Sequence, residues 1–475
     1  MMNRKLLSSA GAFAASLLAS SAAWAQEGPI KAPTAEQMAG MVDKGDTTWM
    51  LICSALVLMM SIPGLALFYG GLVRAKNMLS VCMQVFMIVA VTGLMWVVVG
   101  YSLAFTSGGE NHIVGGLSKA MLMGVDGTTL AATFSNNVYV PELSFVVFQM
   151  TFAMITPALI VGAFAERVKF SGLMVFVVLW SLVVYYPMAH MVWYWAGPDF
   201  LADATSDAGM LWAWGALDFA GGTVVHINAG IAGLVGCLMI GKRAGYPKEP
   251  MPPHSLVMTM IGASLLWVGW FGFNAGSNLE SNGVTAVAFI NTMVATCAAA
   301  VSWSLVEQFH HGKASMLGAA TGAVAGLVAI TPAAGFAAPG TAIVLGFVVS
   351  PLCYLFVAKV KNMFGYDDSL DVFGVHCIGG IVGAIATGIV AAPSLGGQGV
   401  FDYTQFPAAF DPSSYSIGSQ VFIQIKAVLF TLVYSGVLSA VLYFIVGKTI
   451  GLRPSAEDEN VGLDISSHGE RAYNM

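Results

Sequence analysis

Long apolar segments separated by short polar stretches run through most of the chain. Each is close to the length of about 20 residues that a helix needs to cross the hydrocarbon core of a bilayer. The pattern predicts an all-α polytopic membrane protein with eleven transmembrane helices. The expected helices cover residues 47–73, 78–106, 140–168, 171–196, 220–241, 254–276, 284–308, 315–333, 337–360, 373–392 and 419–451.

The composition agrees with that pattern. Hydrophobic residues make up 57% of the chain and charged residues only 9%, whereas soluble domains carry roughly a quarter charged residues. The lipid bilayer is therefore an expected partner. Nucleic acid is not, because no basic cluster is present to neutralise phosphates.

Residues 1–25 have the features of a cleaved signal peptide. A basic pair precedes an apolar stretch, and the segment ends in Ala-Trp-Ala, an A-x-A cleavage pattern. A first transmembrane helix is the alternative, but the apolar part is too short for one. The predicted organisation is a signal peptide 1–25, a periplasmic segment 26–46, an eleven-helix domain 47–452 and a cytoplasmic tail 453–475.

The distribution of charge supports this orientation. An N-terminus outside the cytoplasm and eleven crossings place the C-terminus inside. Of the 19 Lys and Arg residues, thirteen then lie on the cytoplasmic side and three outside, as the enrichment of basic residues in cytoplasmic loops requires. The signal peptide and topology indicate the inner membrane of a two-membrane bacterium, and a single-membrane host also fits them.

The six cysteines all fall in apolar segments and show no C-x-x-C spacing. We predict free thiols that fill the core rather than a disulfide framework. No nucleophile–base constellation or phosphate-binding loop stands out, so an enzyme is disfavoured.

Two of the predicted helices carry a related motif. Residues 226–233 read HINAGIAG and residues 376–383 read HCIGGIVG, so both fit H-x-x-x-G-I-x-G. An aspartate precedes each motif, Asp218 in the first and Asp371 in the second, and on residue type alone each is a candidate cap of its helix. If helices one to five and six to ten are the repeats, their odd number makes them inverted, as is common in transporters. A long eleventh helix follows.

An ionisable side chain at mid-membrane is costly and usually faces a cavity or a partner, so His226 and His376 are candidate functional residues. Three roles are open: a neutral imidazole bound to a backbone carbonyl, a ligand of a metal or haem, or a hydrogen-bonding group in a narrow pore. Zinc requires further protein ligands, and neither histidine is followed by a ligand residue at position i+3 or i+4. We predict a functional pair and no cofactor.

Five stretches resemble one known family. They are GALDFAGGTVVHINAG at 215–230, FQMTFAMITPALIVGAFAERVKF at 148–170, GWFGFNAGS at 269–277, DDSLDVFGVHCIGGIVG at 367–383 and GLDISSHGERAYNM at 462–475. All are similar to the ammonium transporter family (Amt/MEP, with the Rh proteins as distant relatives), and most similar to its bacterial channels. The resemblance implies eleven helices, an external N-terminus and a homotrimer with one pore per subunit.

The resemblance also implies roles for single residues. His226 and His376 match the paired histidines of the family's pore, and Gln149 matches a pore-side polar position. Phe152 and Phe273 match two stacked phenylalanines that close the external end of the pore. The external ammonium-recruiting site is matched by Trp193, Ser277 and Phe152, with Asp218 beside it.

Residue types alone favour plainer roles for several of these positions. Phe152 and Phe273 would be packing residues, Trp193 an interfacial aromatic and Ser277 a small residue between helices. The chemistry nevertheless suits ammonium, because aromatic faces supply cation–π attraction and a hydroxyl accepts a hydrogen bond.

The C-terminal tail is polar and acidic, which on composition alone favours a disordered segment. Its ending resembles the family tail that contacts the cytoplasmic loops and helps to dock trimeric PII signal proteins. The residues that carry this expectation are Gly462, Asp464, His468, Gly469 and Tyr473.

The main hypothesis is an ammonium channel or transporter that recruits the cation outside, deprotonates it near Phe152 and Phe273, and conducts ammonia past His226 and His376. An ammonium sensor that signals to a cytoplasmic partner is the first alternative. A membrane cytochrome with a haem held by the two histidines is the second.

Overall fold

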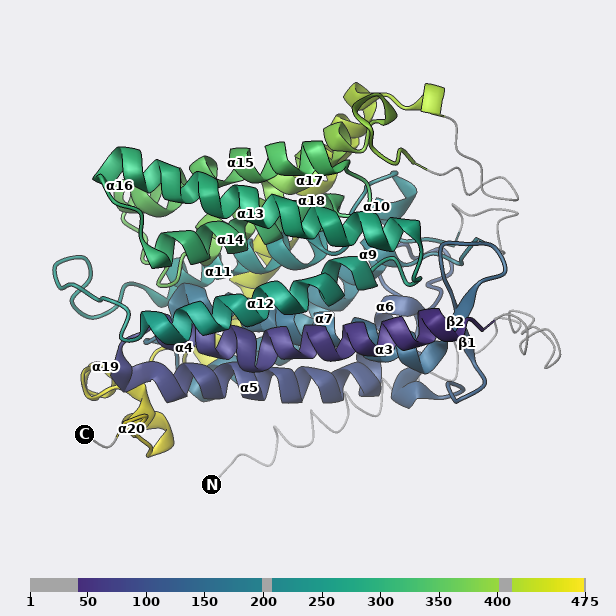
Figure 1. Ribbon diagram of the computed structural model, residues 1–475. Coiled ribbons are helices and arrows are strands. Elements are labelled where there is room, and N and C mark those ends of the chain that lie inside the picture. The colour runs from purple at the N-terminus through teal and green to yellow at the C-terminus, as the bar shows by residue number, and fades with distance from the viewer. Residues whose placement is uncertain (1–41, 199–206, 401–411, 474–475) are drawn as a thin grey trace, which may run out of the picture.

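The computed structural model describes residues 42–198, 207–400 and 412–473 (Figure 1). Within them, eleven stretches of helix are long and apolar enough to cross a membrane, as predicted. These spans are Lys44–Leu72, Ala75–Phe105, Glu142–Phe164, Phe170–Trp193, Gly222–Ile240, Leu256–Gly276, Gly283–His311, Met316–Ala333, Pro339–Phe364, Phe373–Val390 and Ile417–Thr449. Each end lies within four residues of its predicted position. The predicted signal peptide 1–25 and most of segment 26–46 lie outside the described residues.

Several spans consist of two helices joined by a π-helical turn. The helices are α3 (Lys44–Met59), α4 (Ala66–Leu72), α5 (Met78–Met95), α6 (Tyr101–Phe105), α7 (Glu142–Ile160), α8 (Phe170–Trp180), α9 (Tyr186–Trp193), α10 (Met210–Ala213), α11 (Asn228–Ile240), α12 (Leu256–Gly276), α13 (Gly283–His311), α14 (Met316–Ile330), α15 (Pro339–Leu355), α16 (Lys361–Phe364), α17 (Ile378–Val390), α18 (Ile417–Thr449), α19 (Ala456–Val461) and α20 (Leu463–His468). Strands β1 (Leu130–Ala132) and β2 (Tyr139–Pro141) form one antiparallel hairpin, with Ala131 opposite Val140.

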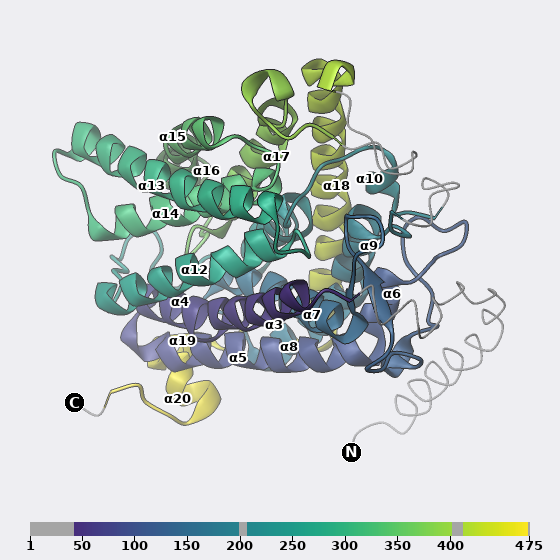
Figure 2. The same cartoon turned by 45° about the vertical axis from the view of Figure 1, so that its right-hand side comes forward.

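The long helices run roughly side by side, so the molecule has two ends (Figures 1 and 2). One end carries β1, β2, α6 and α10, and we call it the hairpin end. The opposite end carries α16, α19 and α20, and we call it the tail end. The two ends correspond to the two sides of the membrane in the predicted topology.

Small residues allow the helices in the centre to approach closely. A Cβ atom added to Gly230 of α11 would lie 2.5 Å from the backbone nitrogen of Cys377, and one added to Gly383 of α17 would lie 2.2 Å from the carbonyl oxygen of Ala329. In lipid, such close packing replaces the hydrophobic effect as the source of helix association. The two histidine-bearing segments are thereby held against each other. All six cysteines are free thiols, as predicted, but they do not all fill the core, because Cys297 is exposed and Cys82 is only partly buried.

Candidate functional site

His226 and His376 occupy equivalent places in the structure. His226 lies in a π-helical turn, Gly222–Ile227, that leads into α11, and His376 lies in another, Phe373–Cys377, that leads into α17. Both side chains are buried, at 1% and 5% exposure. Their Nδ1 atoms lie 3.3 Å apart and their rings are nearly parallel, at an interplanar angle of 23°. The two repeated motifs therefore meet in one site.

The histidine pair lines a narrow cavity whose other walls are apolar or aromatic. The lining residues are Met60, Leu65, Phe68, Ile155, Leu159, Val225, His226, Leu266, Trp270, Phe273, Val324 and His376. The Nε2 atom of His226 is buried and has no hydrogen-bond partner in the described part of the chain. Because an unpaired buried polar atom is costly, this nitrogen is available to a small polar molecule in the cavity.

The two Nδ1 atoms are too close together to bind one metal ion from opposite sides. Two such ligands would lie about 4 Å apart, twice a metal–nitrogen bond of about 2 Å. Here the Nδ1 atoms are 3.3 Å apart and the rings lie side by side. Among the described residues, no three His, Cys, Asp or Glu side chains form a metal-binding group. The geometry favours a shared hydrogen bond between the imidazoles.

Trp270 fixes the position of the His226 ring. The two rings lie 5.4 Å apart at an angle of 25°. The Trp270 indole N–H donates to Thr331 Oγ1 at 2.9 Å, and the Thr331 hydroxyl donates to the Leu327 carbonyl at 2.7 Å. The sequence interpretation missed both residues, because they stand 61 positions apart on different helices.

Asp218 caps the first histidine segment, as predicted. Its carboxylate accepts hydrogen bonds from the backbone N–H groups of Gly221 to Val224, at 2.5 to 3.2 Å, and from the Thr223 hydroxyl. The carboxylate is therefore occupied by the start of the helix. Asp218 contacts Trp193 of the predicted recruiting site through its backbone, since the Trp193 indole N–H donates to the Asp218 carbonyl at 3.0 Å.

The expected cap on the second segment was assigned to the wrong aspartate. Asp368 accepts from the backbone N–H groups of Val372 and Phe373, at 3.1 and 2.8 Å. Asp371 instead has a left-handed backbone, at φ 60°, and pairs with Lys361. Asp368 stands eight residues before His376, as Asp218 does before His226. The repeat therefore extends to the capping acid.

An aromatic cluster covers the hairpin-end side of the cavity. The Phe152 and Phe273 rings lie 4.3 Å apart, and Trp193 meets Phe152 edge-on at 5.7 Å. Phe273 also lies 6.0 Å from the His226 ring. Phe152 and Phe273 are both 1% exposed. The residues predicted to form the gate thus lie beside Trp193, which is predicted to recruit the cation, and Phe273 lies against the His226 ring.

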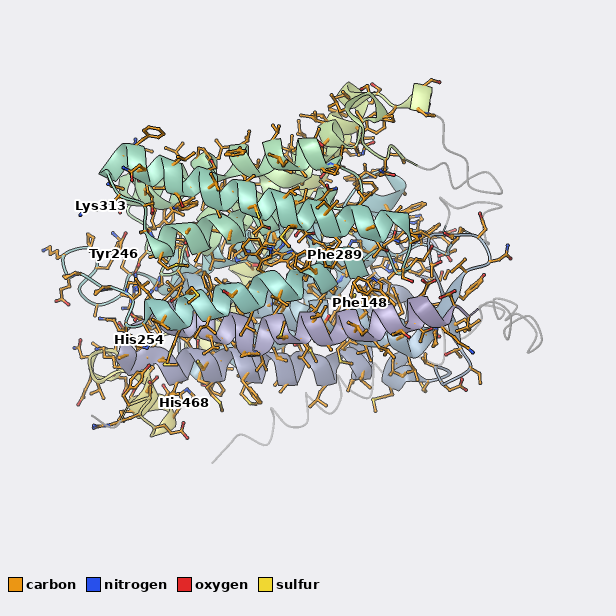
Figure 3. All side chains as sticks on the ribbon, viewed as in Figure 1. Phe148, Tyr246, His254, Phe289, Lys313 and His468 are labelled. Atoms are coloured by element: carbon orange, nitrogen blue, oxygen red, sulfur yellow. The ribbon has the colours of Figure 1, made fainter. Side chains whose placement is uncertain are left out.

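Phe148 belongs to the same cluster and was missed. Phe148, which is labelled in Figure 3, lies one helical turn before Phe152 on α7, and the two rings are 5.0 Å apart. A Cβ atom on Gly276, the residue before Ser277, would lie 2.9 Å from the Phe148 ring. The spacing of four residues in FQMTF was the available signal, because such positions share one face of a helix.

Ser277 lies at the edge of this cluster, and Gln149 is the residue after Phe148 in sequence. The Ser277 hydroxyl donates to the Phe273 carbonyl at 2.8 Å, which leaves its oxygen lone pairs free to accept. Gln149 is 9% exposed, and its Oε1 atom is buried without a partner within the described ranges. Gln149 is next to Phe148 on α7 and is not one of the cavity-lining residues named above.

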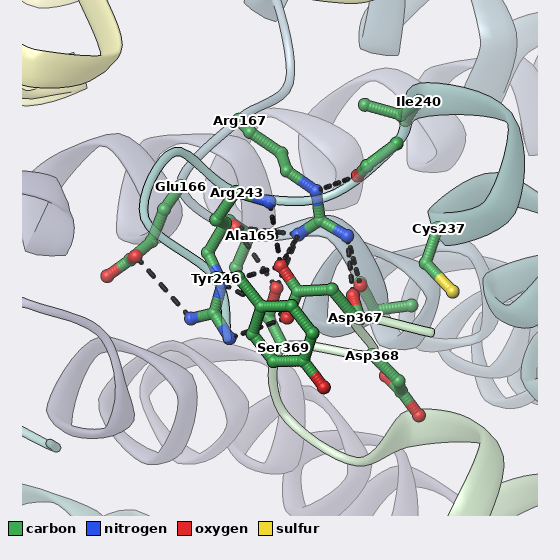
Figure 4. A network of polar contacts seen from close by, with 12 residues as sticks. Ala165, Glu166, Arg167, Cys237, Ile240, Arg243, Tyr246, Asp367, Asp368 and Ser369 are labelled. Atoms are coloured by element: carbon green, nitrogen blue, oxygen red, sulfur yellow. Dashed lines mark hydrogen bonds and ion pairs between the residues drawn. The ribbon is translucent and has the colours of Figure 1, made fainter. Parts of the chain in front are cut away.

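A polar network at the tail end fixes the loops between the helices (Figure 4). Arg243 pairs with Asp367 at 2.8 Å and lies 3.5 Å from Glu166. Arg167, which is fully buried, donates to the carbonyl groups of Gly241 and Asp367. Burial would raise the pKa of Glu166, but hydrogen bonds and charges from the arginines lower it below its usual value. The network places Asp367, and hence the neighbouring Asp368 cap, in a fixed position.

Residues 453–473 of the C-terminal tail are ordered and pack against the tail-end loops, in agreement with the resemblance and not with the composition. Asp464 accepts from the Ser80 backbone N–H at 2.7 Å, at the start of α5. The His468 ring meets Phe170 edge-on at 5.2 Å, and the Tyr473 hydroxyl contacts His254 Nε2 at 3.1 Å. Gly462 and Gly469 have positive φ angles, 106° and 70°, at the two ends of α20. All five predicted tail residues therefore shape or anchor this short helix.

Glu459 connects the tail to the polar network. Its carboxylate pairs with Arg453 at 2.5 and 2.9 Å and lies 3.4 Å from the backbone nitrogen of Ala244. Lys76 donates to the Asn460 carbonyl at 2.6 Å. The tail thus touches the same loops that hold the second histidine segment.

Comparisons with known proteins agree with this site. The family model described as Ammonium Transporter Family matches residues 48–473. An ammonium transporter of Aquifex aeolicus is 46% identical over 91% of this chain and 94% of its own length. An ammonium transporter of Bacillus subtilis is 45% identical over 90% and 98%. These relatives are transporters and not enzymes, as the sequence interpretation expected for this chain.

Solved structures show the same fold. The crystal structure of Mep2 from Saccharomyces cerevisiae matches with a TM-score of 0.76 and 31% identity, over 88% of this chain and 92% of that protein. A structure named Sensor Amt Protein matches with a TM-score of 0.78 over 91% and 99%, but at 24% identity it supports the fold alone. On these matches, the chain belongs to the ammonium transporter family.

Proposed function

We propose that this protein carries ammonium into the cell across a bacterial inner membrane, with ammonia as the species that passes the histidine pair. One observation carries the proposal. An aromatic gate of Phe152 and Phe273 lies directly over an apolar cavity lined by His226 and His376. The names of the relatives, which are ammonium transporters, support the same substrate.

The aromatic cluster at the hairpin end suits recruitment of the cation. Ammonium is strongly hydrated, so a selective site must replace water with other favourable contacts. The faces of Phe148, Phe152 and Trp193 supply cation–π attraction, and Ser277 presents a hydroxyl oxygen already oriented by its bond to Phe273. The fully engaged carboxylate of Asp218 adds a buried negative charge to the helix start behind Trp193.

The gate and cavity suit passage of the neutral molecule. Phe152 and Phe273 are in contact and almost fully buried, so a hydrated ion does not fit between them without displacing a ring. Ammonium can lose a proton and enter as ammonia, whereas potassium cannot. Desolvation beyond the gate thus discriminates between cations of similar size.

The histidine pair suits hydrogen bonding to ammonia. Two neutral imidazoles whose Nδ1 atoms share one proton must be opposite tautomers. One ring then presents Nε2 as an acceptor and the other presents Nε2–H as a donor. Ammonia both donates and accepts, so it is matched to such a pair.

The test is a rapid ammonium jump on proteoliposomes, with current and internal pH recorded together. The wild-type protein should give a larger current or pH change than protein-free liposomes. The variants His226→Ala and His376→Ala should abolish this signal or allow potassium to pass. His112→Ala is the control, because His112 contacts the Ala208 carbonyl at the hairpin end and lies away from the cavity. Current without internal alkalinisation means that the proton crosses too, and alkalinisation without current means that ammonia crosses alone.

Absence of both signals in folded, oriented protein would contradict transport and would favour the sensor alternative. If His226→Ala and His376→Ala transport as well as His112→Ala, the two pore histidines have no role in the mechanism, although transport itself is retained. The experiment therefore separates the substrate from the role of the two residues.

We further propose a homotrimer, a periplasmic N-terminus released by signal cleavage and a cytoplasmic tail that helps to dock a PII signal protein. The ordered α19 and α20, held on the tail-end loops by Glu459 and Asp464, support a docking role. Deletion of residues 462–475 should weaken PII binding to the purified protein, and unchanged affinity would show that the tail is not part of the docking surface.

The homotrimer is tested by chemical cross-linking in membranes, which should give a product of three chains.

A further inference from the structure

A second cluster of potential ligand atoms lies at the tail end, away from the histidine cavity. His310 and His311 are the last two residues of α13, and Tyr354 lies on α15. Lys313, two residues after His311, marks this corner of the molecule in Figure 3. Both histidines are exposed, whereas Tyr354 is 7% exposed with its hydroxyl directed at them. Neither the proposed pore nor the tail uses these residues.

Three donor atoms converge in this cluster. His310 Nδ1 and His311 Nε2 lie 3.3 Å apart. The Tyr354 hydroxyl lies 2.7 Å from His311 Nε2 and 3.4 Å from His310 Nδ1. Adjacent residues on a helix normally point in different directions, so two neighbouring imidazoles that meet one phenol are unusual. The atoms form a small triangle that is open to solvent on the histidine side.

The size of this triangle suits a transition metal ion. Bonds of about 2.0–2.1 Å in a tetrahedral site place neighbouring donor atoms about 3.3 Å apart. Two of the three edges, 3.3 and 3.4 Å, already have that length, and the third needs a small movement of the phenol. Imidazole nitrogen favours zinc, copper and nickel over magnesium and calcium, which prefer oxygen.

The surrounding charges are compatible with a cation. The cluster stands at the C-terminal end of α13, where the last carbonyl groups carry partial negative charge. The Glu307 carboxylate is one turn back on the same helix and is held by Trp303 Nε1 and the Ser315 backbone. Lys313 is the nearby basic side chain in the sequence, on the turn that follows.

We propose that His310, His311 and Tyr354 form a binding site for one divalent first-row transition metal ion per chain, with copper bound most tightly. The two imidazoles bind as neutral ligands, and the phenol loses its proton to the solvent when it coordinates. Water completes the coordination shell on the exposed side. The order of affinity follows from the general preference of nitrogen ligands for copper over zinc and nickel.

The test is titration of the tag-free full-length protein in detergent with Cu²⁺ and, separately, Zn²⁺. Wild type should bind one ion of either metal per chain. His310→Ala and His311→Ala should each weaken binding by about tenfold or more. Both residues are exposed, so these variants should fold, and a melting curve checks that they do. His112→Ala and His254→Ala, which alter histidines bound to backbone carbonyls elsewhere, should bind like wild type.

Spectroscopy distinguishes this site from general surface binding. The Cu²⁺ form should show electron paramagnetic coupling to two nitrogens and a visible phenolate-to-copper charge-transfer band. Tyr354→Phe should lose that band while keeping the nitrogen coupling. Unchanged affinity in the His310→Ala/His311→Ala double variant, or equal losses in the His112 and His254 controls, would overturn the proposal.

Discussion

Asp218 and Asp368 hold equivalent positions in the two halves of the molecule, each eight residues before a buried histidine and each bonded to the first backbone N–H groups of that histidine's helix. A carboxylate at a helix start satisfies N–H groups that have no partner inside the helix. In a membrane interior these groups have no water to bond instead. The two acids therefore set where each histidine segment begins.

Replacing either acid should destabilise the folded protein. Loss of a capping side chain costs about 0.5–2 kcal/mol, and buried donors left unpaired add about 1–3 kcal/mol. We expect Asp218→Ala to lower the melting temperature in detergent more than Asp368→Ala, because Asp218 accepts from four backbone N–H groups and Asp368 from two. Asp371→Asn is the control, because asparagine tolerates the left-handed backbone that Asp371 adopts, at φ 60°. A larger loss in Asp371→Asn than in Asp368→Ala would contradict the assignment of the cap.

The spans could be predicted from the sequence because the bilayer fixes helix length and the loops are polar. The pairing of His226 with His376 could also be anticipated, since both belong to one repeated motif. Proximity to the helix in sequence does not identify Asp368 as the cap, because Asp371 is nearer to the helix. The intervening turn bends the chain back at Asp371, whose left-handed backbone directs its side chain to Lys361. The equal spacing of eight residues was the signal that identifies it.

Other parts of the site depend on contacts that no local pattern encodes. Trp270 and Thr331 meet only because α12 packs against the span that contains α14. The order in the tail likewise comes from its partners, because Asp464 and Glu459 find backbone N–H groups at the ends of other segments. A polar composition predicts disorder when such partners are not known.

Phe148 should contribute to ammonium recruitment through its aromatic face. Phe148→Leu keeps most of the buried apolar volume but removes the π system, so we expect a severalfold rise in the ammonium concentration for half-maximal current. The melting temperature should change little. Phe289→Leu is the matched control, because Phe289 is 41% exposed and stacks on Phe271, outside the cluster. An unchanged half-maximal concentration in Phe148→Leu would assign Phe148 to packing alone.

The tail-end network should make the protein sensitive to acid. Burial alone would raise the pKa of the Glu166 and Asp367 carboxyls, but bonds and charges from Arg74, Arg167 and Arg243 lower both below their usual values. Stability from a lowered pKa is present above the unfolded value of about 4 and is lost as the pH falls through the folded value. We therefore expect the protection of backbone amides against hydrogen exchange, relative to the unstructured chain at the same pH, to fall steeply below about pH 4 in the loops at 165–169 and 241–245.

Glu166→Gln provides the check on that pH dependence. In this variant the loop amides should be less protected than in the wild type at neutral pH. Their protection should fall less on acidification, because one of the two titrating groups is gone. The same loss of protection in both proteins would mean that other carboxyls cause the acid sensitivity.

Thr331 should act as a positioning residue for the histidine pair. Thr331→Val removes the acceptor of the Trp270 indole N–H, which leaves a buried donor unpaired at a cost of about 1–3 kcal/mol. Released from that bond, the Trp270 ring is free to tilt away from its near-parallel contact with His226 at 5.4 Å. We expect Thr331→Val to lower both the ammonium current and its selectivity over potassium, whereas Thr331→Ser should behave like wild type. A variant that only loses stability, with unchanged selectivity in the folded fraction, would show that Thr331 packs the core without orienting the pore.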